Sequence, residues 1–272
     1  MITGATRVAG VIGDPVRHSL SPRLHNAAYR ALDLDWLFAA FEVPDGGAAA
    51  ALNAARVLGF VGLSVTMPHK TAMAGLCDEL SPGAADLRSV NTVTVRADGS
   101  CAGDSTDGDG FLRSLAEAGV EVKGTAAVVL GGGGAARAVA RALAGAGARV
   151  EVAARKADAA AAAAALASGV AVEWAGRADA VSAADIVVNA TPVGMAGDAS
   201  LPLPEGVLRA GLVVADLVYE PRETPLLAAA RSRGARVVPG LGMLVHQAAR
   251  QVELWSGRPA PLDAMRAAVA RA

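Results

Sequence analysis

Lys70 is the residue whose type and place in this chain most directly suggest acid–base chemistry. It follows the segment SVTMPH, in which an apolar strand pattern ends at Pro68. The chain has 25 lysines and arginines, and only Lys70, Lys123 and Lys156 are lysines. Arginine keeps its proton in proteins, whereas a lysine can exchange one when its surroundings shift its pKa. The choice of lysine here predicts a proton-transfer role, with an ordinary surface lysine at a helix start as the alternative.

Ser19 and Ser21 stand two residues apart in HSLSP, directly before Pro22. Serine followed by proline is typical of a helix start, so Ser21 as a plain N-cap is one interpretation. Two hydroxyls at a helix N-terminus can also bind a small carboxylate, because the backbone N–H groups there favour negative charge. The sequence leaves both interpretations open.

Asp107 belongs to an acidic segment, GDSTDGDGF, that also contains Asp104 and Asp109. A calcium-binding loop needs a bidentate glutamate at its twelfth position, and counting from Asp107 that position is Ala118. Asp107 as a helix N-cap is the simpler interpretation. Histidines, cysteines and carboxylates show no zinc-site spacing, so we expect no metal.

A glycine-rich loop, LGGGGAAR, follows an apolar strand pattern and precedes a helical one. It fits the pattern G-x-G-x-x-A through Gly131, Gly133 and Ala136. Glycines at these places let the chain turn tightly and let the backbone approach a pyrophosphate, whose charge a helix N-terminus stabilises. In this context the loop predicts a dinucleotide site, with a plain tight turn as the alternative.

The end of the second strand of this βαβ unit indicates which dinucleotide binds. Sites for NAD usually carry an acidic residue there, about 20 positions further along, to bind the ribose hydroxyls. In VEVAARK, Glu151 lies mid-strand and the tip carries Arg155 and Lys156. Because a guanidinium can bind a phosphate through two parallel hydrogen bonds, this tip favours NADP.

The elements that must position these residues alternate between strand and helix patterns. In the first half the pattern predicts strands and helices ending in a hairpin at Asp98-Gly99, followed by a helix over 107–119. In the second half, strands alternate with helices from the glycine loop onward, which predicts a parallel sheet covered by helices. Two helical patterns end the chain and are expected to return to the first half. We therefore predict an α/β fold with two α/β domains.

The overall composition narrows the function classes. Hydrophobic residues make up 53% of the chain and charged residues 19%, with a net charge of -1. This balance, without a basic stripe, argues against nucleic acid or an anionic membrane as partner. No stretch approaches the ~20 apolar residues of a membrane span, and the N-terminus is typical of a first strand. Cys77 and Cys101 form no CxxC pattern, so we expect free thiols, which fits a cytoplasmic location. We expect the protein to be a monomer or a homodimer.

In the order and spacing of its motifs the chain resembles the shikimate dehydrogenase family. Eight segments carry the resemblance and cover nearly the whole chain: GDPVRHSLSPRLHN, SVTMPHK, VNTV, GDSTDGDGF, LGGGGAAR, NATPVGM, DLVYEPRETPLL and GLGMLVHQAA. The resemblance implies the reversible NADPH-dependent reduction of 3-dehydroshikimate to shikimate in aromatic amino-acid (chorismate) biosynthesis. It also implies a substrate-binding and catalytic domain of residues 1–106 with 241–272, a Rossmann-type NADP-binding domain of residues 107–240, and substrate in the cleft between them.

The same motifs imply a role for individual residues. Lys70 and Asp107 would form the catalytic pair. The implied substrate contacts are Ser19, Ser21, Thr66, Asn91, Tyr219 and Gln247. The implied cofactor contacts are Gly131, Gly132, Gly133, Gly134, Ala135, Ala136, Arg155, Thr191, Leu217, Gly240 and Met243.

Other functions on the same fold stay open. A quinate/shikimate dehydrogenase that uses NAD would be favoured by an aspartate at the strand tip, where Arg155 stands. A relative acting on aminoshikimate is not separated by these motifs. A non-catalytic NADP-binding regulator would be expected to lack Lys70 or Asp107, and both are present. Ala154 replaces the asparagine that often precedes the cofactor arginine in this family, which leaves Arg155 more of the NADP selectivity to supply.

Overall fold

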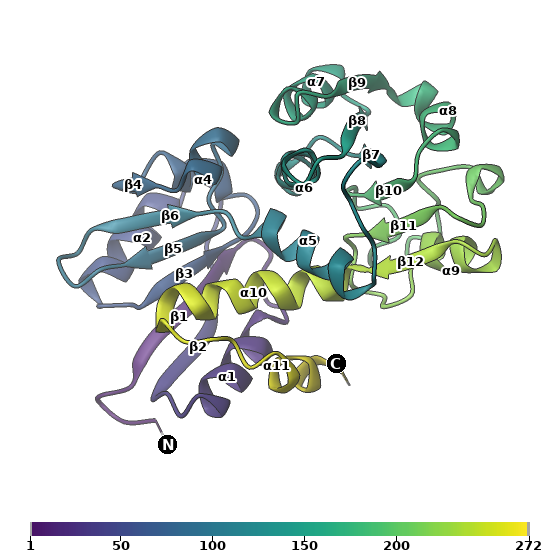
Figure 1. Cartoon of the computed structure of the whole chain (residues 1–272). Helices are drawn as coiled ribbons and strands as arrows, with labels where there is room; N and C mark the ends of the chain where they lie inside the picture. Colours follow the sequence, from purple (N-terminus) through teal and green to yellow (C-terminus); the bar gives the residue numbers. More distant parts are fainter. Residues whose placement is uncertain (1, 271–272) are drawn as a thin grey trace. The chain divides into compact units, whose positions relative to one another are not determined.

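The computed structural model describes residues 2–270 of the chain. They form two compact units: unit 1 contains the residues up to Thr106 and those from Gln247 onward, and unit 2 contains Asp107–His246 (Figure 1). The second boundary falls inside α10 (Gly240–Ser256), between His246 and Gln247, whereas the family resemblance implies a return at 241. Among the residues described, no helix combines the length and apolarity needed to span a membrane.

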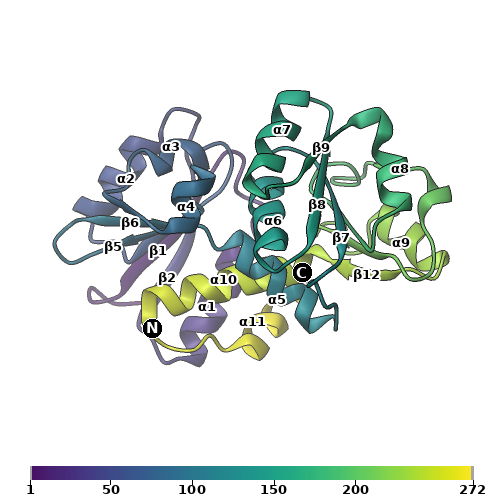
Figure 2. The same cartoon turned by 45° about the horizontal axis from the view of Figure 1, so that its top comes forward.

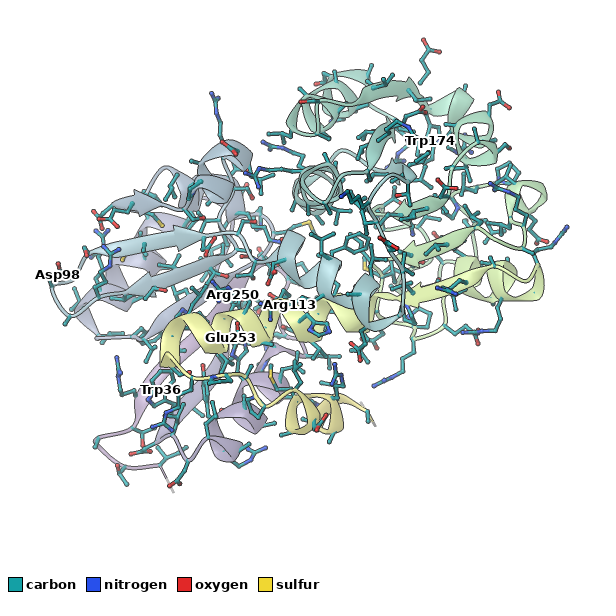
Figure 3. The ribbon with its side chains drawn as sticks, in the orientation of Figure 1. Trp36, Asp98, Arg113, Trp174, Arg250 and Glu253 are labelled. Atoms are coloured by element: carbon teal, nitrogen blue, oxygen red, sulfur yellow. The ribbon has the colours of Figure 1, made fainter. Side chains whose placement is uncertain are left out.

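Unit 1 is built on a mixed six-stranded sheet in the order β2-β1-β3-β5-β6-β4. β1 runs parallel to β2 and β3, and β5 runs antiparallel to β3 and β6. The predicted hairpin is confirmed between β5 and β6, where Gly99 has a φ of 82° and Asp98 lies at the tip (Figure 3). The strands are β1 (Arg7–Gly13), β2 (Trp36–Glu42), β3 (Gly62–Val65), β4 (Glu79–Leu80), β5 (Thr92–Val95) and β6 (Cys101–Asp104).

Helices cover both faces of the unit 1 sheet. One core joins β1, β3 and β5 to α2 and α3 through Ile12, Leu52 and Met73. Elsewhere in the unit Trp255 approaches the backbone at Gly62, where a Cβ would lie 2.4 Å from the indole nitrogen. The helices are α1 (Ser21–Ala31), α2 (Ala48–Val57), α3 (Lys70–Ala74), α4 (Pro82–Leu87), the later part of α10, and α11 (Leu262–Val269).

Unit 2 contains a fully parallel six-stranded sheet in the order β12-β11-β10-β7-β8-β9. The first strand in sequence, β7, lies between β8 and β10, so the strand order reverses at this point. This is the doubly wound arrangement whose ligands bind beyond the carboxyl ends of the strands. The strands are β7 (Ala126–Leu130), β8 (Arg149–Ala154), β9 (Val170–Glu173), β10 (Ile186–Asn189), β11 (Val213–Asp216) and β12 (Arg236–Pro239).

Both faces of the unit 2 sheet are buried, as its short apolar strands predict. Along β7, Ala127 and Val129 join one core with α5 and α6, while Val128 and Leu130 join a second core with α8 and α9. Figure 2 shows α6 and α7 on one side of this sheet and α8 and α9 on the other. The elements are α5 (Asp107–Glu117), α6 (Gly134–Gly145), α7 (Ala157–Leu166), the 3-10 turn η1 (Trp174–Gly176), α8 (Arg177–Ser182), η2 (Glu205–Val207) and α9 (Pro225–Ser232).

Candidate functional site

The glycine loop of unit 2 connects β7 to α6 at the strand-order reversal. Gly131 has a φ of 120°, and a Cβ on it would lie 2.7 Å from the carbonyl oxygen of Ala190. At Gly132 a Cβ would lie 2.7 Å from the Cβ of Ala159, at the start of α7. These two positions therefore need glycine, because one requires left-handed backbone and both require close approach.

Gly133 leaves the N-terminus of α6 open. It caps the helix in an extended conformation without a side-chain hydrogen bond, and a Cβ built on it would meet no atom within 4 Å. The N–H groups of the first helical turn, from Gly134 to Ala136, have no carbonyl partner inside the helix. Open space in front of these groups fits the pyrophosphate of a dinucleotide.

The tip of β8 carries the residues that would select the cofactor. The strand ends at Ala154, and Arg155 and Lys156 follow it, both exposed. Their positive charge at this place fits the 2′-phosphate of NADP. Glu151 is only the third residue of β8, so it does not occupy the place of an acidic ribose ligand.

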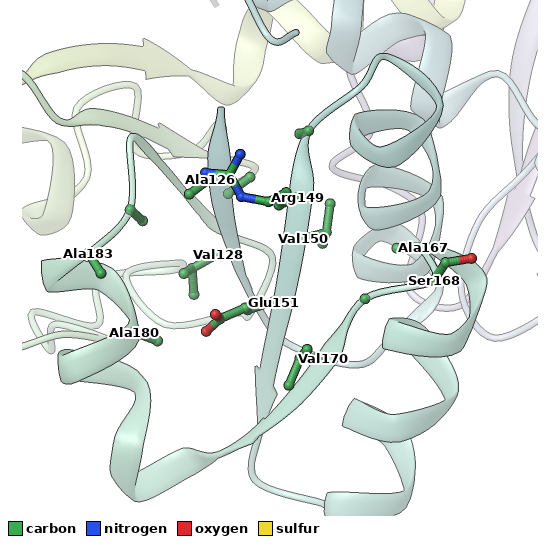
Figure 4. A pocket seen from close by; sticks show the side chains of 14 residues that line it. Ala126, Val128, Arg149, Val150, Glu151, Ala167, Ser168, Val170, Ala180 and Ala183 are labelled. Atoms are coloured by element: carbon green, nitrogen blue, oxygen red, sulfur yellow. The ribbon is translucent and has the colours of Figure 1, made fainter. Parts of the chain in front are cut away.

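A cavity of about 420 Å³ lies at the opposite, amino-terminal edge of the unit 2 sheet. It is lined by the first residues of β7 and β8, by Ala180 of α8, and by Ala183 and Ala184, which follow that helix. Figure 4 shows Glu151 extending from β8 toward the α8 side of this hollow. Dinucleotides bind beyond the carboxyl ends of such strands, so this cavity is not a cofactor site. It exists because the side chains of Ala180, Ala183 and Ala184 are too short to fill the space.

The other candidate cofactor residues of unit 2 follow the carboxyl ends of β10, β11 and β12. Thr191 lies two residues after β10 and Leu217 directly after β11, and both are half-buried. Gly240 begins α10, where a Cβ would lie 2.6 Å from the carbonyl oxygen of Leu217. Met243 differs from the rest, because it is 9% exposed and packs in the core with Phe111.

Tyr219, a candidate substrate contact, also belongs to unit 2. It lies three residues beyond β11 and is half-buried. Burial raises the pKa of its phenol, and the neighbouring Glu220 acts in the same direction. A phenol with a raised pKa keeps its proton at neutral pH and can donate a hydrogen bond.

Asp107 is the first residue of α5 and is buried. The next residue, Gly108, lets α5 approach α6 closely, since a Cβ there would lie 2.9 Å from the Cβ of Ala142 and 3.0 Å from the carbonyl oxygen of Ala138. Asp107 is therefore held on the helix that packs against the helix of the glycine loop.

Lys70 is the first residue of α3 in unit 1, one residue after the buried His69. The His69 ring bonds through Nε2 to the carbonyl oxygen of Val43 over 2.8 Å. The Lys70 carbonyl accepts a hydrogen bond from the backbone N–H of Val90 over 2.9 Å. These contacts fix the backbone from which the Lys70 side chain extends.

The two serines lie at the start of α1, as the sequence predicts, but the N-cap interpretation of Ser21 is wrong. Ser21 is the first helical residue, and Leu20 occupies the cap position without a side-chain hydrogen bond. Instead the hydroxyl of Ser19 accepts a hydrogen bond from the backbone N–H of Ser21 over 3.2 Å. Thr66 follows β3, and its backbone N–H donates to the carbonyl oxygen of Ile12 over 3.0 Å.

Asn91 is buried immediately before β5 and is bound to Thr106. Its Oδ1 accepts a hydrogen bond from the Thr106 backbone N–H over 2.8 Å, and its Nδ2 donates to the Thr106 hydroxyl over 3.0 Å. Thr106 is the last residue of unit 1 before Asp107. The amide of Asn91 thus fixes the point at which the chain leaves unit 1 for Asp107.

Gln247 lies on α10, and one helical turn further Gln251 forms a buried polar network. The Gln251 amide nitrogen donates to the hydroxyls of Ser64 over 3.2 Å and Thr92 over 3.0 Å. Its Oε1 bonds to Nε2 of His25 over 3.1 Å. Because residues four apart share a helix face, this network fixes the face of α10 that carries Gln247.

His25 is itself fully buried and stacks on Phe38, with ring centroids 4.1 Å apart. Burial lowers its pKa to about 3, while the hydrogen bond with Gln251 acts in the opposite direction. The ring is therefore neutral at physiological pH, and we assign it a structural role in holding Gln251.

In unit 2 the glycine loop, Arg155, Thr191, Leu217 and Gly240 follow the carboxyl ends of the strands, whereas Met243 packs in the core and Asp107 begins a helix that packs on α6. Sequence reasoning missed the residues that hold the candidates, namely Thr106, Gln251, Asn189 and Asp216. The spacing of four between Gln247 and Gln251 is the one signal in the sequence that could have revealed a second polar residue on that helix face.

Family descriptions match three segments of the chain. Residues 11–93 match the shikimate dehydrogenase substrate binding domain, and residues 240–270 match the shikimate 5'-dehydrogenase C-terminal domain. Residues 126–217 match the NADP oxidoreductase coenzyme F420-dependent family. The last match spans β7 to β11 and agrees with the Rossmann-type topology.

Whole-chain comparisons agree with these matches. The chain is 44% identical over 275 residues to shikimate dehydrogenase (NADP(+)) from Rubrobacter xylanophilus, covering 98% of this chain and 97% of the relative. It superimposes with a TM-score of 0.91 on shikimate 5-dehydrogenase from Thermus thermophilus in complex with NADP(H) and shikimate, at 36% identity over 97% of this chain and 99% of that one. It also superimposes with a TM-score of 0.93 on quinate dehydrogenase from Corynebacterium glutamicum in complex with NAD, at 34% identity over 98% and 99%.

Proposed function

The chain belongs to the shikimate dehydrogenase family, and from that premise we propose that Lys70 and Asp107 carry out the reversible reduction of 3-dehydroshikimate to shikimate with NADPH. In the reductive direction the substrate carbonyl gains a hydride at carbon and a proton at oxygen. Bound NADPH supplies the hydride. Lys70, as the ammonium, gives the proton to the developing alkoxide, and as the amine it accepts the proton in reverse.

One observation carries the assignment of the pair. The Lys70 carbonyl bonds to the N–H of Val90, and the next residue, Asn91, bonds through its side chain to Thr106. One peptide bond then leads to Asp107. The proton-transfer lysine and the backbone of the proposed carboxylate partner are thus both attached to the segment that begins β5.

Asp107 has two tasks in this proposal. Its carboxylate accepts a hydrogen bond from the substrate hydroxyl that is oxidised or formed, and it orients the ammonium of Lys70. Groups that hold a reacting proton within hydrogen-bond reach lower the barrier by preorganisation, because no solvent has to rearrange during the step. The tight packing of Gly108 on α6 supports this role, since it restricts the start of α5.

The remaining unit 1 candidates would bind the substrate. Ser19 and Ser21, at the start of α1, would bind its carboxylate through their hydroxyl groups. Thr66, Asn91 and Gln247 would contact the ring hydroxyls. Tyr219 of unit 2 would donate from a phenol that stays protonated.

Unit 2 would hold the cofactor. The glycine loop and the first turn of α6 would bind the pyrophosphate, and Arg155 would bind the 2′-phosphate. Thr191, Leu217, Gly240 and Met243 would lie near the nicotinamide end. Of these, Met243 would act by shaping the adjacent core rather than by direct contact.

A panel of cofactors and substrates tests the proposal. The purified chain should oxidise shikimate with NADP and should do so faster than with NAD, because no acidic residue stands at the β8 tip. Equal rates with NAD would contradict the cofactor assignment and favour the quinate/shikimate dehydrogenase alternative. Tight NADP binding without any shikimate oxidation would instead favour a non-catalytic regulator of the same fold.

A cytoplasmic location is also part of the proposal. Cys77 and Cys101 are free thiols, one half-buried and one buried, as expected in a reducing compartment. We expect a monomer or a homodimer, which sedimentation velocity would distinguish.

A further inference from the structure

Three buried polar side chains lie together at the carboxyl end of the unit 2 sheet. Asn189 ends β10 and Asp216 ends β11, and the two residues face each other in register on neighbouring parallel strands. Thr224 precedes α9 and caps it. Their exposed fractions are 0%, 1% and 0%. We call Asn189, Asp216 and Thr224 the polar triad.

Asp216 closes the loop that follows its own strand. Its Oδ1 accepts a hydrogen bond from the backbone N–H of Val218 over 3.0 Å, and its Oδ2 accepts one from the hydroxyl of Thr224 over 2.6 Å. One carboxylate therefore holds both ends of residues 217–223. This loop contains Leu217 and Tyr219.

Asn189 extends the same network to the loop after β10. Its Nδ2 donates to Oδ1 of Asp216 over 2.9 Å and to the carbonyl oxygen of Val193 over 3.1 Å. Its Oδ1 accepts from the backbone N–H of Thr191 over 3.1 Å and from the Thr191 hydroxyl over 2.6 Å. All four hydrogen-bonding positions of this amide are occupied.

The two loops also meet directly beside the triad. Gly194 has a φ of 91°, and a Cβ on it would lie 3.6 Å from both the Cβ of Thr224 and the Cδ of Pro225. The start of α10 comes closer still, since a Cβ on Gly240 would lie 2.7 Å from the carbonyl oxygen of Asp216. A shift of the triad would therefore move residues after three neighbouring strands.

Burying the carboxylate of Asp216 in the triad costs electrostatic free energy. Burial raises the pKa of Asp216, while hydrogen bonds from Thr224, Val218 and Asn189 lower it. A well-packed apolar side chain at the end of β11 would avoid the desolvation penalty of a buried carboxylate. What an apolar side chain cannot do is accept hydrogen bonds from two loops at once.

We propose that Asp216 is a positioning residue that presets the two loops for cofactor and substrate, acting through Asn189 on Thr191 and through Val218 and Thr224 on Tyr219. The inference rests on the proposed function, because the roles of Thr191 and Tyr219 come from it. Asp216 itself is buried behind the loops and acts through its three partners. It carries no step of the reaction.

The variants Asp216→Asn and Thr224→Val change the triad with little change in volume. In Asp216→Asn one oxygen can still accept the two N–H bonds. The other becomes an amide nitrogen, which can only donate to the Thr224 hydroxyl and leaves the hydroxyl proton without this acceptor. Thr224→Val removes the same bond from the other side and adds the loss of the α9 cap. If one variant does not fold, the other still tests the bond between Asp216 and Thr224.

Asp185→Asn is the matched control. The carboxylate of Asp185 also accepts a backbone N–H bond, from Ala126 over 2.8 Å, but at the amino-terminal edge of the same sheet. It is exposed and lies on no loop proposed to bind a ligand. This variant measures what the loss of a carboxylate bond in unit 2 does without a change in the two loops.

Three measurements distinguish a positioning role of Asp216 from a contribution to the stability of unit 2 alone. Hydrogen–deuterium exchange of the unliganded chain should show faster exchange in residues 217–223 for both triad variants and unchanged exchange there for Asp185→Asn. The NADPH Kd and the shikimate KM should each rise about tenfold in the triad variants, because small displacements of binding groups are costly, while kcat falls less. The control should keep wild-type values for both.

Distinct outcomes overturn the inference and the proposed function. Wild-type Kd and KM in the triad variants would overturn the positioning role, and so would faster exchange in residues 217–223 without any loss of binding. A wild-type chain that does not oxidise shikimate would overturn the proposed function. In that case exchange and the NADPH Kd still decide whether Asp216 positions the loops.

Discussion

Unit 2 and unit 1 position their candidate site residues by different physical means. In unit 2 the strands are parallel, so their carboxyl ends meet at one edge, and the residue after each strand reaches that edge by topology alone. Gly131, Arg155 and Leu217 are placed in this way, whereas Thr191 lies one residue further from its strand and is held by Asn189. In unit 1 the sheet is mixed, and Asn91 and the face of α10 that carries Gln247 depend on buried side-chain hydrogen bonds instead.

The strand order of unit 1 does not explain which residues its polar network joins. Gln251 of α10 reaches Ser64 on β3, Thr92 on β5 and His25 on α1, three elements far apart in the sequence. Asn91 holds Thr106 in the same way. Unit 2 also has buried polar contacts. Its polar triad, however, lies at the strand ends and holds only the loops that follow them, whereas the unit 1 network joins different strands and helices. The units should therefore respond differently to substitution.

The largest effect is expected at Lys70, where unit 1 would supply the reaction itself. Lys70→Ala should lower kcat about 10³-fold with little change in the shikimate KM, because the residue acts in proton transfer. Lys70→Arg should restore little of this rate, since arginine keeps its proton. Steady-state kinetics with shikimate and NADP measure both variants. Near-normal turnover of Lys70→Ala would refute the role.

The next largest effect is expected at Gln251, where a substitution should lower the stability of unit 1. Gln251→Leu leaves the ring of His25 and the hydroxyls of Ser64 and Thr92 buried without this partner. It should destabilise unit 1 by about 3 kcal/mol, since buried polar groups that lose their partner are costly. The shikimate KM should rise, while the NADPH Kd should stay unchanged.

Tryptophan fluorescence can follow the two units separately during urea unfolding. Trp36 and Trp255 belong to unit 1 and Trp174 to unit 2, so a Trp174→Phe background reports on unit 1 alone. Arg250→Gln is the control on the same helix, because its bond to Glu253 is partly exposed. An equal loss of NADPH affinity in Gln251→Leu would show that the network serves both units.

Unit 2 could be predicted from the sequence more completely than unit 1, because strand ends place its residues while long-range hydrogen bonds hold those of unit 1. Periodicity identified each parallel strand, and strand ends then located the glycine loop and Arg155 without any tertiary knowledge. In unit 1 the roles of Thr66 and Asn91 were inferred only from the family resemblance. The partners of Asn91 and the network of Gln251 stayed hidden, because a bond such as Gln251 to Ser64 spans 187 positions and leaves no periodic signal.

A smaller effect should appear as acid sensitivity of unit 1. Burial lowers the pKa of His25 from 6.5 to about 3, so the unfolded chain binds a proton in this window and the folded chain does not. Stability should therefore fall as the pH drops from 6.5 toward 3, and His25 contributes no pH dependence above that window. At pH 5 the loss is about 2 kcal/mol by linkage.

Urea unfolding of the Trp174→Phe protein between pH 7 and 4.5 measures this loss. His25→Gln should flatten the profile whatever its effect on absolute stability. His18→Gln removes an exposed histidine and should leave the profile unchanged. If the His25 variant kept the full acid dependence, other groups of unit 1 would have to account for it.

The smallest effect is expected at the tip of β8, and it completes the contrast between the units. Arg155 is exposed, so its attraction for the 2′-phosphate is weakened by solvent and salt. Arg155→Gln should lower the ratio of kcat/KM for NADP over NAD about tenfold and leave the shikimate KM unchanged. The ratio in the wild type should fall with rising salt and in the variant should hardly change. Lys156→Gln, one residue further along, should lower the ratio less, because an ammonium cannot bind the phosphate through two parallel bonds. A raised shikimate KM in Arg155→Gln would mean that the tip of β8 does not serve the cofactor alone.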